Sequence, residues 1–534
     1  MNRLRTSRVG VVVAGSRIPT AAIDLIEWLQ QRQGAAGACV LLIVDESTTA
    51  AARTSSQARL GSLFQSIVWG AVERAEARRL RGNSYFNGFA ASSSIDPKTL
   101  EGRIASRRIG ELDGAYLANA DFDVLVQFGE TVLESQLAGF AKAGLLKICH
   151  GDGYWEVLEQ DGGTAFAIRQ FRPDGAPSIP ILSGKLPTQS YCLLNQAALS
   201  RRCGHHVKRL LEQLFESGAL PGPCAELPQD YFHRPCPSAL DGVAYVARSV
   251  ARMLVGKARS LLGREERWAI SFTGRSWRNA VLSEGTAVTN PPGRFFADPF
   301  VHVEGDRVFC FVEDYVDVKK RGLISALEFG SAGVKDYGPI IEEDFHLSFP
   351  YLFSFEGQLF MCPEANESGQ IRIYRCVDLP LRWQLHSVAM EGVCAVDTMI
   401  FESGGRWWML TNIDPAPKMK TFCELHLFSA VDPISGTWVP HPMNPLIIDP
   451  ATARNGGLLR DGASVFRVAQ ARTFGSYGTY ASIFEITALS ESDYSEREVA
   501  RVTPEFRRGL TGAHHMHSSG GYTVWDHKRW ERPA

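Results

Sequence analysis

The sequence predicts a multidomain protein in which an α/β domain is followed by an all-β five-bladed propeller. Two observations lead to this fold class. Continuous apolar runs alternate with helical patterns in the first third of the chain, and a hairpin unit recurs five times in the second half, at a spacing of roughly 50 residues. We place the α/β domain at residues 1–200, a proline-rich and helical linker at 201–265, and the propeller at 266–534.

The α/β domain is predicted from three apolar runs and a helical pattern. The runs are RVGVVVAG (8–15), ACVLLIVDE (38–46) and FDVLVQFG (122–129), and the helical pattern is AAIDLIEWLQQ (21–31). Continuous apolar strands separated by helices indicate a parallel sheet that is covered on both faces, which is a Rossmann-like arrangement. Gly10 and Gly15 do not form a GxGxxG motif, so a dinucleotide site is not predicted.

Composition narrows the class of partner and the location. A formal net charge of -2 gives no general electrostatic reason to bind nucleic acid, so a small molecule or a glycan fits better. The 11 cysteines form no CxxC pair, which favours reduced thiols. The first apolar run is short and is followed by Ser16 and Arg17, so we interpret it as a buried strand and not as a signal peptide. We therefore expect a cytoplasmic protein.

The linker ends in a basic amphipathic segment. After the proline-rich stretch at 221–242, the sequence VAYVARSVARMLVGKARSLLG has helical spacing. One face carries Val243, Val246, Val250, Leu254 and Leu261, and the cations Arg248, Arg252, Lys257 and Arg259 lie largely elsewhere. Two interpretations follow: peripheral contact with the inner face of a membrane through 243–262, or docking between the two domains.

The propeller is predicted from the repeated hairpin. Its units begin at Ala297, Phe349, Val396, Arg454 and Gly512, and each contains an apolar run, a glycine turn and a second apolar strand. In a propeller the innermost strands converge on the axis. The first residues of the units should therefore line one axial pocket: Asp298, Phe349, Pro350, Asp397, Arg454, Asn455, His514 and His515.

The "ADPF" motif at Asp298 resembles the first blade of the family-43 glycoside hydrolases. That resemblance implies that Asp298 is a general base and that Asp397 is the second aspartate, which orients and tunes the site. The family's acid glutamate lies at the head of a later blade, but the fourth unit here reads "ARNGG", so ordinary glycoside hydrolysis is not expected. Glu313, Asp314 and Glu364 follow second strands, where they either replace that acid or are solvated loop acids.

A further resemblance covers essentially the whole propeller. The motifs FFADPF, SFPYLF, RWWMLTN, NPLIIDPATARNGG, AQARTFGSYGTY and HHMHSSGGYTVWDHKR resemble, in order, the propeller of plant glucosamine inositolphosphorylceramide transferases. In those proteins glycosyl transfer is attributed to a separate domain, which this sequence does not show. The resemblance implies glycan or glycolipid handling in the biosynthesis of a surface polysaccharide or glycolipid.

The pocket side chains suit a charged sugar. Arg454 offers a planar fork for a phosphate or carboxylate, and Gln470, Tyr477, His514 and His515 offer directional hydrogen bonds to hydroxyl groups. A sugar, a sugar nucleotide or a glycolipid headgroup is the expected ligand. Alternatively, Arg454 pairs with Asp298 or Asp397 across the axis. No metal site is predicted, because adjacent histidines on a strand point to opposite faces.

The N-terminal domain has its own resemblance, to the formyltransferase fold. It rests on the stretch from "FDVLVQFG" to "HGDGYWE" and on the later "RPDGAPSIP". It implies that His150 and Asp174 are catalytic and that formyl-tetrahydrofolate is a possible cofactor. Ile148 replaces the asparagine of the family's motif, which weakens formyl transfer. Asp152 and Trp155 follow the strand at the edge where open α/β sheets bind ligands.

Three functional hypotheses follow. In the first, the protein is a transferase that acts on a sugar bound in the propeller. In the second, the N-terminal domain is a folate-dependent N-formyltransferase for an amino sugar. In the third, both sites are noncatalytic and the protein is a glycan-binding scaffold.

Overall fold

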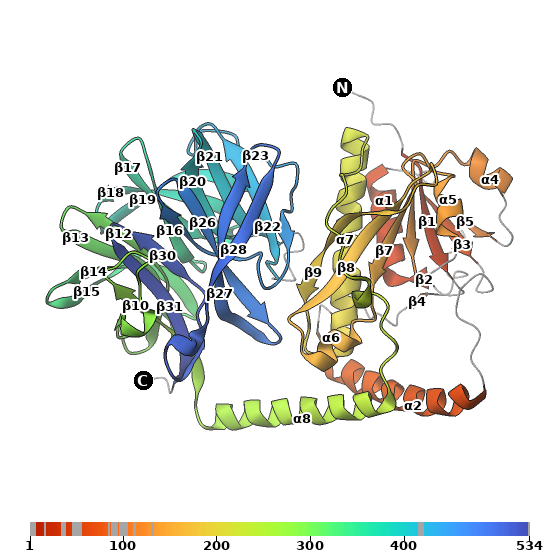
Figure 1. Cartoon of the computed structure of the whole chain (residues 1–534), viewed down its shortest axis with the longest axis horizontal. Helices are drawn as coiled ribbons and strands as arrows, with labels where there is room; N and C mark the ends of the chain where they lie inside the picture. Colours follow the sequence, from red (N-terminus) through yellow and green to blue (C-terminus); the bar gives the residue numbers. More distant parts are fainter. Residues whose placement is uncertain are drawn as a thin grey trace. The chain divides into compact units, whose positions relative to one another are not determined.

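The computed structural model describes residues 7–14, 18–33, 39–44, 56–83, 86, 94–95, 105–109, 114–129, 133–414 and 421–531. The chain forms two compact units, Met1–Ser249 and Val250–Ala534, which are coloured along the sequence in Figure 1. The division falls inside helix α8 (Ala239–Leu261). Within the described residues, no helix has the length and apolar character needed to cross a membrane.

The first unit is built on a seven-stranded sheet with the order β5-β3-β1-β6-β7-β8-β9. Strands β5 to β7 in this order are parallel, and β8 and β9 extend the sheet as antiparallel strands. The strands are β1 (Val9–Ala14), β3 (Cys39–Val44), β5 (Ala105–Ile109), β6 (Val124–Phe128), β7 (Leu145–His150), β8 (Gly163–Phe171) and β9 (Ile179–Pro187). The short strands β2 (Ile18–Pro19) and β4 (Ser94–Ile95) pair separately.

The parallel part of this sheet agrees with the predicted one. The apolar runs at 8–15, 38–46 and 122–129 become β1, β3 and β6, and every residue of β6 is buried. Helices lie between the strands along the chain (Figure 1): α1 (Thr20–Gln33), α2 (Ser56–Arg79), α4 (Gly114–Asn119), α5 (Glu134–Ala138) and α6 (Tyr154–Glu159). Helix α7 (Cys192–Ser217) follows β9, the last strand of the sheet along the chain. The finer Rossmann-like and formyltransferase-like assignments stay predictions.

The second unit consists of five antiparallel sheets in chain order, as a five-bladed propeller requires (Figure 1). Blade 1 contains β12 (Arg294–Glu304), β13 (Arg307–Val316), β14 (Arg321–Gly330) and β15 (Gly333–Ile341). Blade 2 contains β16 (Ser348–Phe355), β17 (Gln358–Glu364), β18 (Gln370–Asp378) and β19 (Arg382–Glu391). Blade 3 contains β20 (Ala395–Ser403), β21 (Arg406–Ile413), β22 (Glu424–Ala430), β23 (Val439–Pro440) and β24 (Ile447–Ile448). Blade 4 contains β25 (Asn455–Asp461), β26 (Ser464–Thr473), β27 (Ser476–Leu489) and β28 (Tyr494–Val502).

The fifth blade closes the ring because it combines both ends of the propeller sequence. From the C-terminal end it takes β29 (Leu510–Gly512), β30 (Met516–Ser519) and β31 (Tyr522–Glu531), and from the N-terminal end it takes β10 (Glu265–Thr273) and β11 (Thr286–Ala287). Strand β10 pairs with β31 along its whole length, from Glu265 opposite Glu531 to Thr273 opposite Thr523. The five predicted units are therefore confirmed as blades, and the predicted propeller is the architecture of this unit.

Candidate functional site

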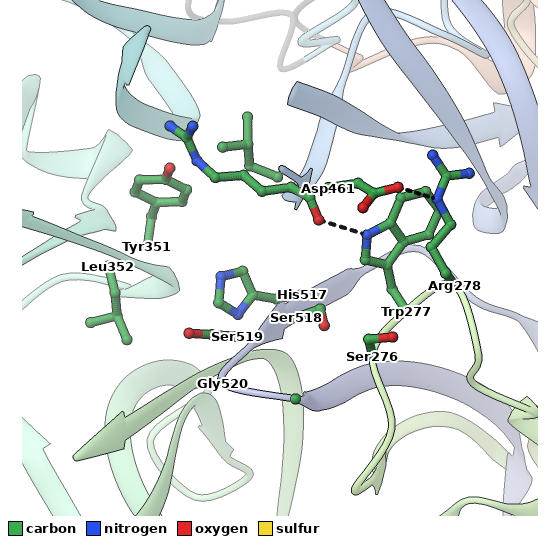
Figure 2. A pocket seen from close by; sticks show the side chains of 13 residues that line it. Ser276, Trp277, Arg278, Tyr351, Leu352, Asp461, His517, Ser518, Ser519 and Gly520 are labelled. Carbon is green, nitrogen blue, oxygen red and sulfur yellow. Dashed lines mark hydrogen bonds and ion pairs between the residues drawn. The ribbon is translucent and has the colours of Figure 1, made fainter. Parts of the chain in front are cut away.

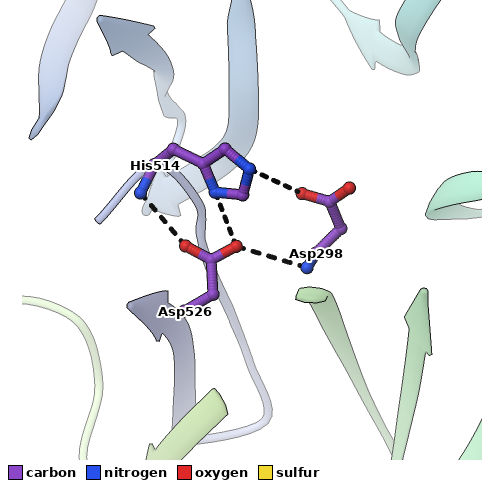
Figure 3. Close-up of side chains that lie close together, drawn as sticks. All are labelled: Asp298, His514 and Asp526. Carbon is purple, nitrogen blue, oxygen red and sulfur yellow. Dashed lines mark hydrogen bonds and ion pairs between the residues drawn. The ribbon is translucent and has the colours of Figure 1, made fainter. Parts of the chain in front are cut away.

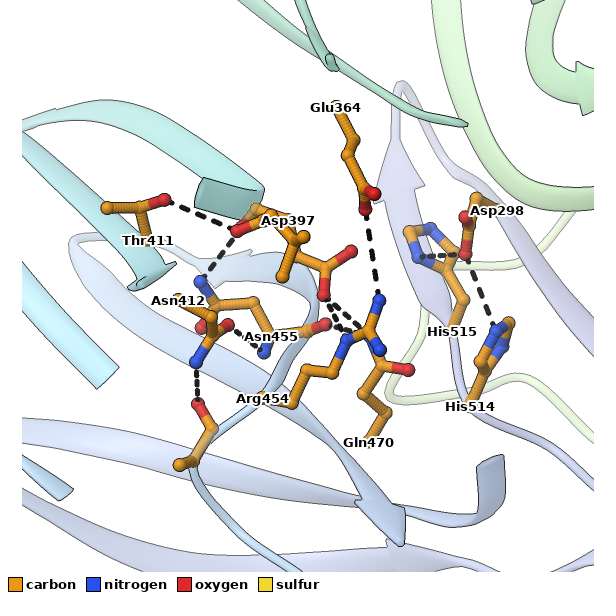
Figure 4. Close-up of polar contacts among 12 residues, drawn as sticks. Asp298, Glu364, Asp397, Thr411, Asn412, Arg454, Asn455, Gln470, His514 and His515 are labelled. Atoms are coloured by element: carbon orange, nitrogen blue, oxygen red, sulfur yellow. Dashed lines mark hydrogen bonds and ion pairs between the residues drawn. The ribbon is translucent and has the colours of Figure 1, made fainter. Parts of the chain in front are cut away.

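The predicted propeller residues meet in one group, which we call the axial cluster (Figure 4). It is defined by Asp298, Glu313, Glu364, Asp397, Arg454, Gln470, Tyr477, His514, His515 and Asp526. These residues come from all five blades. The central prediction, that repeated hairpins bring distant residues to one site, agrees with this arrangement.

A repeated bulge positions the two aspartates. In blades 1 and 3 the register between the first two strands shifts between Ala297 and Phe300 and between Val396 and Met399. Asp298 and Asp397 lie in these bulges in the left-handed region, with φ of 48° and 51°. Aspartate tolerates this conformation better than most residues do, and strained residues of this kind cluster at functional sites. The bulge re-aims a side chain that a regular strand would have placed on its face.

Blade 2 has the same bulge with a different residue. Phe349 occupies the equivalent position with φ of 46°, and it is fully buried. Its ring packs edge-on against Phe300 and His515, with ring centroids 4.9 and 5.4 Å apart. Phe349, which was predicted to line the pocket together with Pro350, therefore belongs to the packing beside the cluster and supplies no polar group to it.

The second strands contribute two further carboxylates. Glu313 on β13 pairs with Ala297, and Glu364 on β17 pairs with Ser348, so both lie beside a bulge. Glu313 is only 9% exposed, and the Glu364 side chain is 10% exposed. They are not solvated loop acids. Asp314 is also buried, but it pairs with Arg294 and accepts a hydrogen bond from Ser325 at 2.6 Å, so its role is structural.

Arg454 links Asp397 to Glu364. Its Nε lies 2.5 Å from Asp397 Oδ2, and its Nη2 lies 3.8 Å from Glu364 Oε2. The guanidinium also lies over the Tyr477 ring, 4.8 Å from the centroid. The predicted alternative, in which Arg454 pairs with an aspartate across the axis, is thus confirmed for Asp397. The Arg454 side chain keeps 22% of its surface exposed, so this part of the cluster reaches solvent.

The side-chain amides of Gln470 and Asn455 donate hydrogen bonds to Asp397, while their own oxygen atoms accept none from the described residues. Gln470 Nε2 donates to Asp397 Oδ2 at 3.1 Å, and Asn455 Nδ2 donates to the Asp397 carbonyl at 2.9 Å. Among the described residues, nothing donates a hydrogen bond to Gln470 Oε1 or Asn455 Oδ1, although both atoms are buried. Buried polar atoms are normally satisfied by protein or solvent, so these two oxygens need a donor that the described protein groups do not provide.

Asp298 lies beside a histidine that a second aspartate orients (Figure 3). His514 Nδ1 is 2.6 Å from Asp526 Oδ2, and His514 Nε2 is 3.8 Å from Asp298 Oδ1. Asp526 also accepts hydrogen bonds from the backbone N–H groups of His514 and His515, at 3.0 Å each. Trp268 stacks on the His514 ring with centroids 3.9 Å apart. Asp526 therefore fixes the imidazole that faces Asp298.

Both adjacent histidines face Asp298, contrary to the prediction that they point to opposite faces. His515 Nδ1 is 3.9 Å from Asp298 Oδ1. The reason is that the inner strand of blade 5 is interrupted between β29 and β30, so the alternation of a regular strand does not apply. Asp298, His514 and Asp526 offer ligand atoms within 4.8 Å of one another, a spacing that a metal ion could also use. His514 Nδ1 and Asp526 Oδ2 already contact each other at 2.6 Å.

The glycines of "ARNGG" permit the close approach of blades 4 and 5. A Cβ on Gly456 would lie 2.3 Å from the His514 carbonyl oxygen, and one on Gly457 would lie 2.2 Å from that of Met516. No side chain fits at such distances from backbone. The glycine pair therefore lets Asn455 lie close to the histidines of the axial cluster.

Burial shifts the proton affinity of the carboxyl groups in this cluster. It raises the pKa of Asp298 to about 7 and, with Asp397 adding repulsion, that of Glu364 to about 8. Burial also raises the pKa of Glu313 well above its usual range. Burial alone would lower the pKa of His514, but the neighbouring Asp526 outweighs it, so this pKa lies above its ordinary value. The cluster therefore retains protons near neutral pH.

The raised pKa of Glu364 predicts a pH-dependent stability. The folded protein holds a proton that the unfolded chain releases above about pH 4.5, so this contribution is complete below about 4.5 and is lost as the pH rises through about 8. We expect Glu364→Gln, which cannot ionise, to gain stability relative to wild type between about pH 5 and 8.5, by more than ~1.4 kcal/mol, the equivalent of one pKa unit. Urea denaturation at the two pH values measures this. An unchanged difference between the two proteins would contradict the burial of an ionisable Glu364.

A cavity lies further along the inner strands (Figure 2). It has a volume of about 410 Å³ and is lined by residues that follow the cluster positions on β16, β25 and β30, including Tyr351, Arg460 and His517. Trp277 and Arg278 line it as well, and they bond to the Arg460 carbonyl and to Asp461, each at 2.9 Å. None of the predicted site residues lines this cavity.

The structure does not bring the two predicted catalytic residues of the first unit together. His150 ends β7 and pairs with Phe166, whereas Asp174 follows Phe171, which pairs with Leu145 at the start of β7. Five residue steps of a strand separate these levels, roughly 17 Å. His150 and Asp174 therefore lie at opposite ends of the strand pair, and the structure does not bring them to one site; their catalytic roles stay predictions.

The other predicted residues near His150 are differently used. Asp152 is exposed. Trp155 donates to the Pro235 carbonyl at 2.6 Å and lies under Arg234, 4.6 Å from its ring centroid. The proline-rich linker segment thus covers Trp155, which acts as an anchor for that segment. Ile148 is buried within the sheet.

The propeller sequence is similar to that of known proteins. Residues 271–518 match the family described as glucosamine inositolphosphorylceramide transferase 1, N-terminal. This match lies inside the propeller unit. Among curated proteins, the glucosamine inositolphosphorylceramide transferase 1 of Arabidopsis thaliana is 34% identical over 255 residues, which are 44% of this chain and 32% of that protein. The protein of the same name from Oryza sativa subsp. japonica is 30% identical over 223 residues, 41% of this chain and 30% of that protein.

The chain spans about a third of the length of these curated relatives. Similar solved structures include an α-L-arabinofuranosidase from Lactobacillus brevis, with 14% identity and a TM-score of 0.33 over 45% of this chain and 91% of that one. A thermostable family-43 glycoside hydrolase gives 13% identity and a TM-score of 0.33 over 46% and 91%. The assignment of five blades rests on the sheets themselves. The match to the transferase family confirms the predicted resemblance of the propeller.

Proposed function

We propose that the protein is an enzyme of glycolipid or surface polysaccharide biosynthesis that binds a sugar in the axial cluster and transfers it to an acceptor hydroxyl group. The observation that carries the proposal is the pair of buried carboxyls with raised pKa values, Asp298 at about 7 and Glu364 at about 8, beside the contact between Arg454 and Asp397. Titratable groups whose environments differ in this way are suited to acid and base roles.

In the proposed reaction Asp298 accepts one proton as the base and Glu364 donates one proton as the acid. Ionised Asp298 accepts the proton of the acceptor hydroxyl group as its oxygen attacks the anomeric carbon. The bond from that carbon to the leaving oxygen breaks, and protonated Glu364 donates a proton to the leaving oxygen. One proton is accepted and one is donated, so the step is balanced. Asp526 holds the His514 imidazole toward Asp298, so that this ring is the neighbouring titratable group of the proposed base.

The electrostatics favour a sugar that carries a negative group. Arg454 exposes part of its guanidinium, which can form paired hydrogen bonds to a phosphate or carboxylate. The unused oxygens of Gln470 and Asn455 can accept from sugar hydroxyl groups. A sugar nucleotide as donor and an inositol phosphate or glycolipid headgroup as acceptor fit this arrangement, and the names of the relatives support the same class of substrate.

Replacing the proposed base tests the function. Purified wild type and Asp298→Asn are incubated with UDP- and GDP-linked sugars and inositol phosphate acceptors, and products are measured by mass spectrometry. We expect transfer by wild type and a loss of about 10²- to 10⁴-fold in the variant. Asp378→Asn, at an exposed aspartate on β18, is the matched control and should retain activity. Equal turnover by Asp298→Asn and Asp378→Asn would refute the assignment. Sugar binding without product in every reaction would instead assign the cluster to glycan recognition.

A further inference from the structure

Helix α8 has two faces with different surroundings. It spans 23 residues from Ala239 to Leu261 and is one continuous helix (Figure 1). Residues that recur at intervals of three and four lie on the same face of a helix. Gly242, Tyr245, Ser249 and Arg252 form one such row, and Val243, Val246, Val250, Leu254 and Leu261 form another.

The first row makes the contacts with protein. Within the first unit, Gly242 and Tyr245 are buried, and the Tyr245 hydroxyl group contacts buried Glu76. A Cβ on Gly242 would lie 2.8 Å from Val68, so this face of the helix packs closely. Within the second unit, the Arg252 guanidinium lies over Phe474 at 5.1 Å from the ring centroid. The face that binds protein is therefore the less apolar one.

The apolar row is exposed. Val250 is 44% exposed, Leu254 59% and Leu261 79%. Six further large hydrophobic side chains of this segment are also exposed: Leu240, Val243, Val246, Met253, Val255 and Leu262. A contiguous exposed apolar surface of this kind marks an interaction site. We call the row Val243, Val246, Val250, Leu254 and Leu261 the α8 stripe.

Charge indicates what covers the α8 stripe. Residues 242–264 contain no acidic residue and the cations Arg248, Arg252, Lys257, Arg259 and Arg264. Three of these also contact protein within their own units: Arg248 donates to the Leu158 carbonyl, and Arg252 and Arg259 lie over the Phe474 and Trp530 rings. Lys257 and Arg264 are exposed. A second copy of this helix would place its cations near the cations of the first, and the two would repel each other. An anionic lipid surface would instead attract these cations.

We propose that α8 lies in the interface of a bilayer containing anionic lipid, with the α8 stripe turned into the acyl region and the cations at the headgroups. Lys257 lies on the same face as Leu254 and Leu261 and reaches the headgroups through its long side chain. The helix does not span the bilayer; it binds in the plane of the surface as amphipathic helices do. This contact would hold the protein at a membrane where lipid-linked acceptors are found. The proposal does not depend on turnover, because membrane binding requires no substrate.

Vesicle sedimentation with the full chain tests this proposal. The probes are vesicles of phosphatidylcholine alone and of phosphatidylcholine with about one third phosphatidylglycerol. We expect wild type to sediment with the anionic vesicles at least tenfold more than with the neutral ones. Leu254→Glu should lose at least tenfold of this binding, and Lys257→Gln combined with Arg264→Gln should lose severalfold. Ser260→Glu, which adds the same charge at an exposed position outside the stripe, should bind more tightly than Leu254→Glu.

Three results would overturn the proposal. One is wild type that stays in the supernatant with anionic vesicles. Another is equal binding by Leu254→Glu and Ser260→Glu. The third is a dimer in lipid-free solution, detected by light scattering, that Leu254→Glu dissociates, because the stripe would then bind a second copy. Circular dichroism and thermal unfolding of each variant establish that the fold is kept, so a loss of binding reports on the surface.

Discussion

Replacing Arg454 with methionine is expected to lower the free energy of unfolding of the propeller by about 3–5 kcal/mol, the usual effect of removing one partner from a buried ion pair. Arg454 contacts Asp397 at 2.5 Å and lies 3.8 Å from Glu364. The Asp397 side chain is only 2% exposed, so without the guanidinium its charge has neither water nor a cation beside it. Urea denaturation followed by tryptophan fluorescence measures the change.

Arg382→Met provides the matched control for this variant. Arg382 begins β19 and is exposed, so its replacement should change stability by no more than about 0.5 kcal/mol. Arg454→Lys should fall between the two, because it keeps the charge and loses the planar fork. If Arg454→Met and Arg382→Met unfold at the same urea concentration, the ion pair is not what compensates the charge of Asp397.

Glu364→Gln is expected to reduce transfer about 10²- to 10⁴-fold, because it removes the proposed proton donor. The pH profile gives a sharper test. Below about pH 7 Asp298 is protonated and cannot accept a proton, and above about pH 8 Glu364 is ionised and cannot donate one. Wild-type turnover should therefore peak between about 7 and 8. The two limbs belong to the coupled cluster as a whole.

In Glu364→Gln the residual activity should lose its alkaline limb. Glu356→Gln is the control, because Glu356 is exposed in the turn of the same blade-2 hairpin and lies outside the cluster. It should keep both activity and profile. If the alkaline limb persists in Glu364→Gln, another group donates the proton, and Glu313 would be the next residue to replace.

Much of the propeller could be predicted from its repeat, because each blade carries its own apolar strands and glycine turn. The positions of Asp298, Asp397 and Arg454 followed from the same periodicity. The sequence could not show the break between β29 and β30 that turns both His514 and His515 toward Asp298. The rule that side chains alternate between two faces holds only for a regular strand. No local residue pattern shows where the hydrogen-bonded pairing of the strand is interrupted.

The acids on the second strands were harder to assign for a different reason. Glu313 and Glu364 follow apolar strands, where either burial or solvation is consistent with sequence. Only the pairing of Glu313 with Ala297 and of Glu364 with Ser348 places them beside the bulges. Asp526 occupies a comparable place on β31 and was not singled out. An acid directly after the apolar run of the second strand in blades 1, 2 and 5 was the signal that could have found it.

In the first unit, local patterns gave the strands but not the site. Strands β1, β3 and β6 are buried in a parallel sheet, and strands buried on both faces consist of consecutive apolar residues. The sequence therefore shows them directly. The relation of His150 to Asp174 depends on the direction of β8, which returns antiparallel to β7 and carries Asp174 to the far end. The formyltransferase-like assignment and the cytoplasmic location stay predictions.

Direct sugar binding is the measurement that tests the central claim, that five blades form one sugar site around Asp298, Asp397 and Arg454. Saturation-transfer difference NMR with UDP-linked sugars and inositol 1-phosphate would be recorded on wild type, Asp298→Asn and Asp378→Asn. We expect saturation transfer to the ligand in wild type and Asp378→Asn and a marked loss in Asp298→Asn. Equal transfer in all three proteins, or none in wild type, would contradict it.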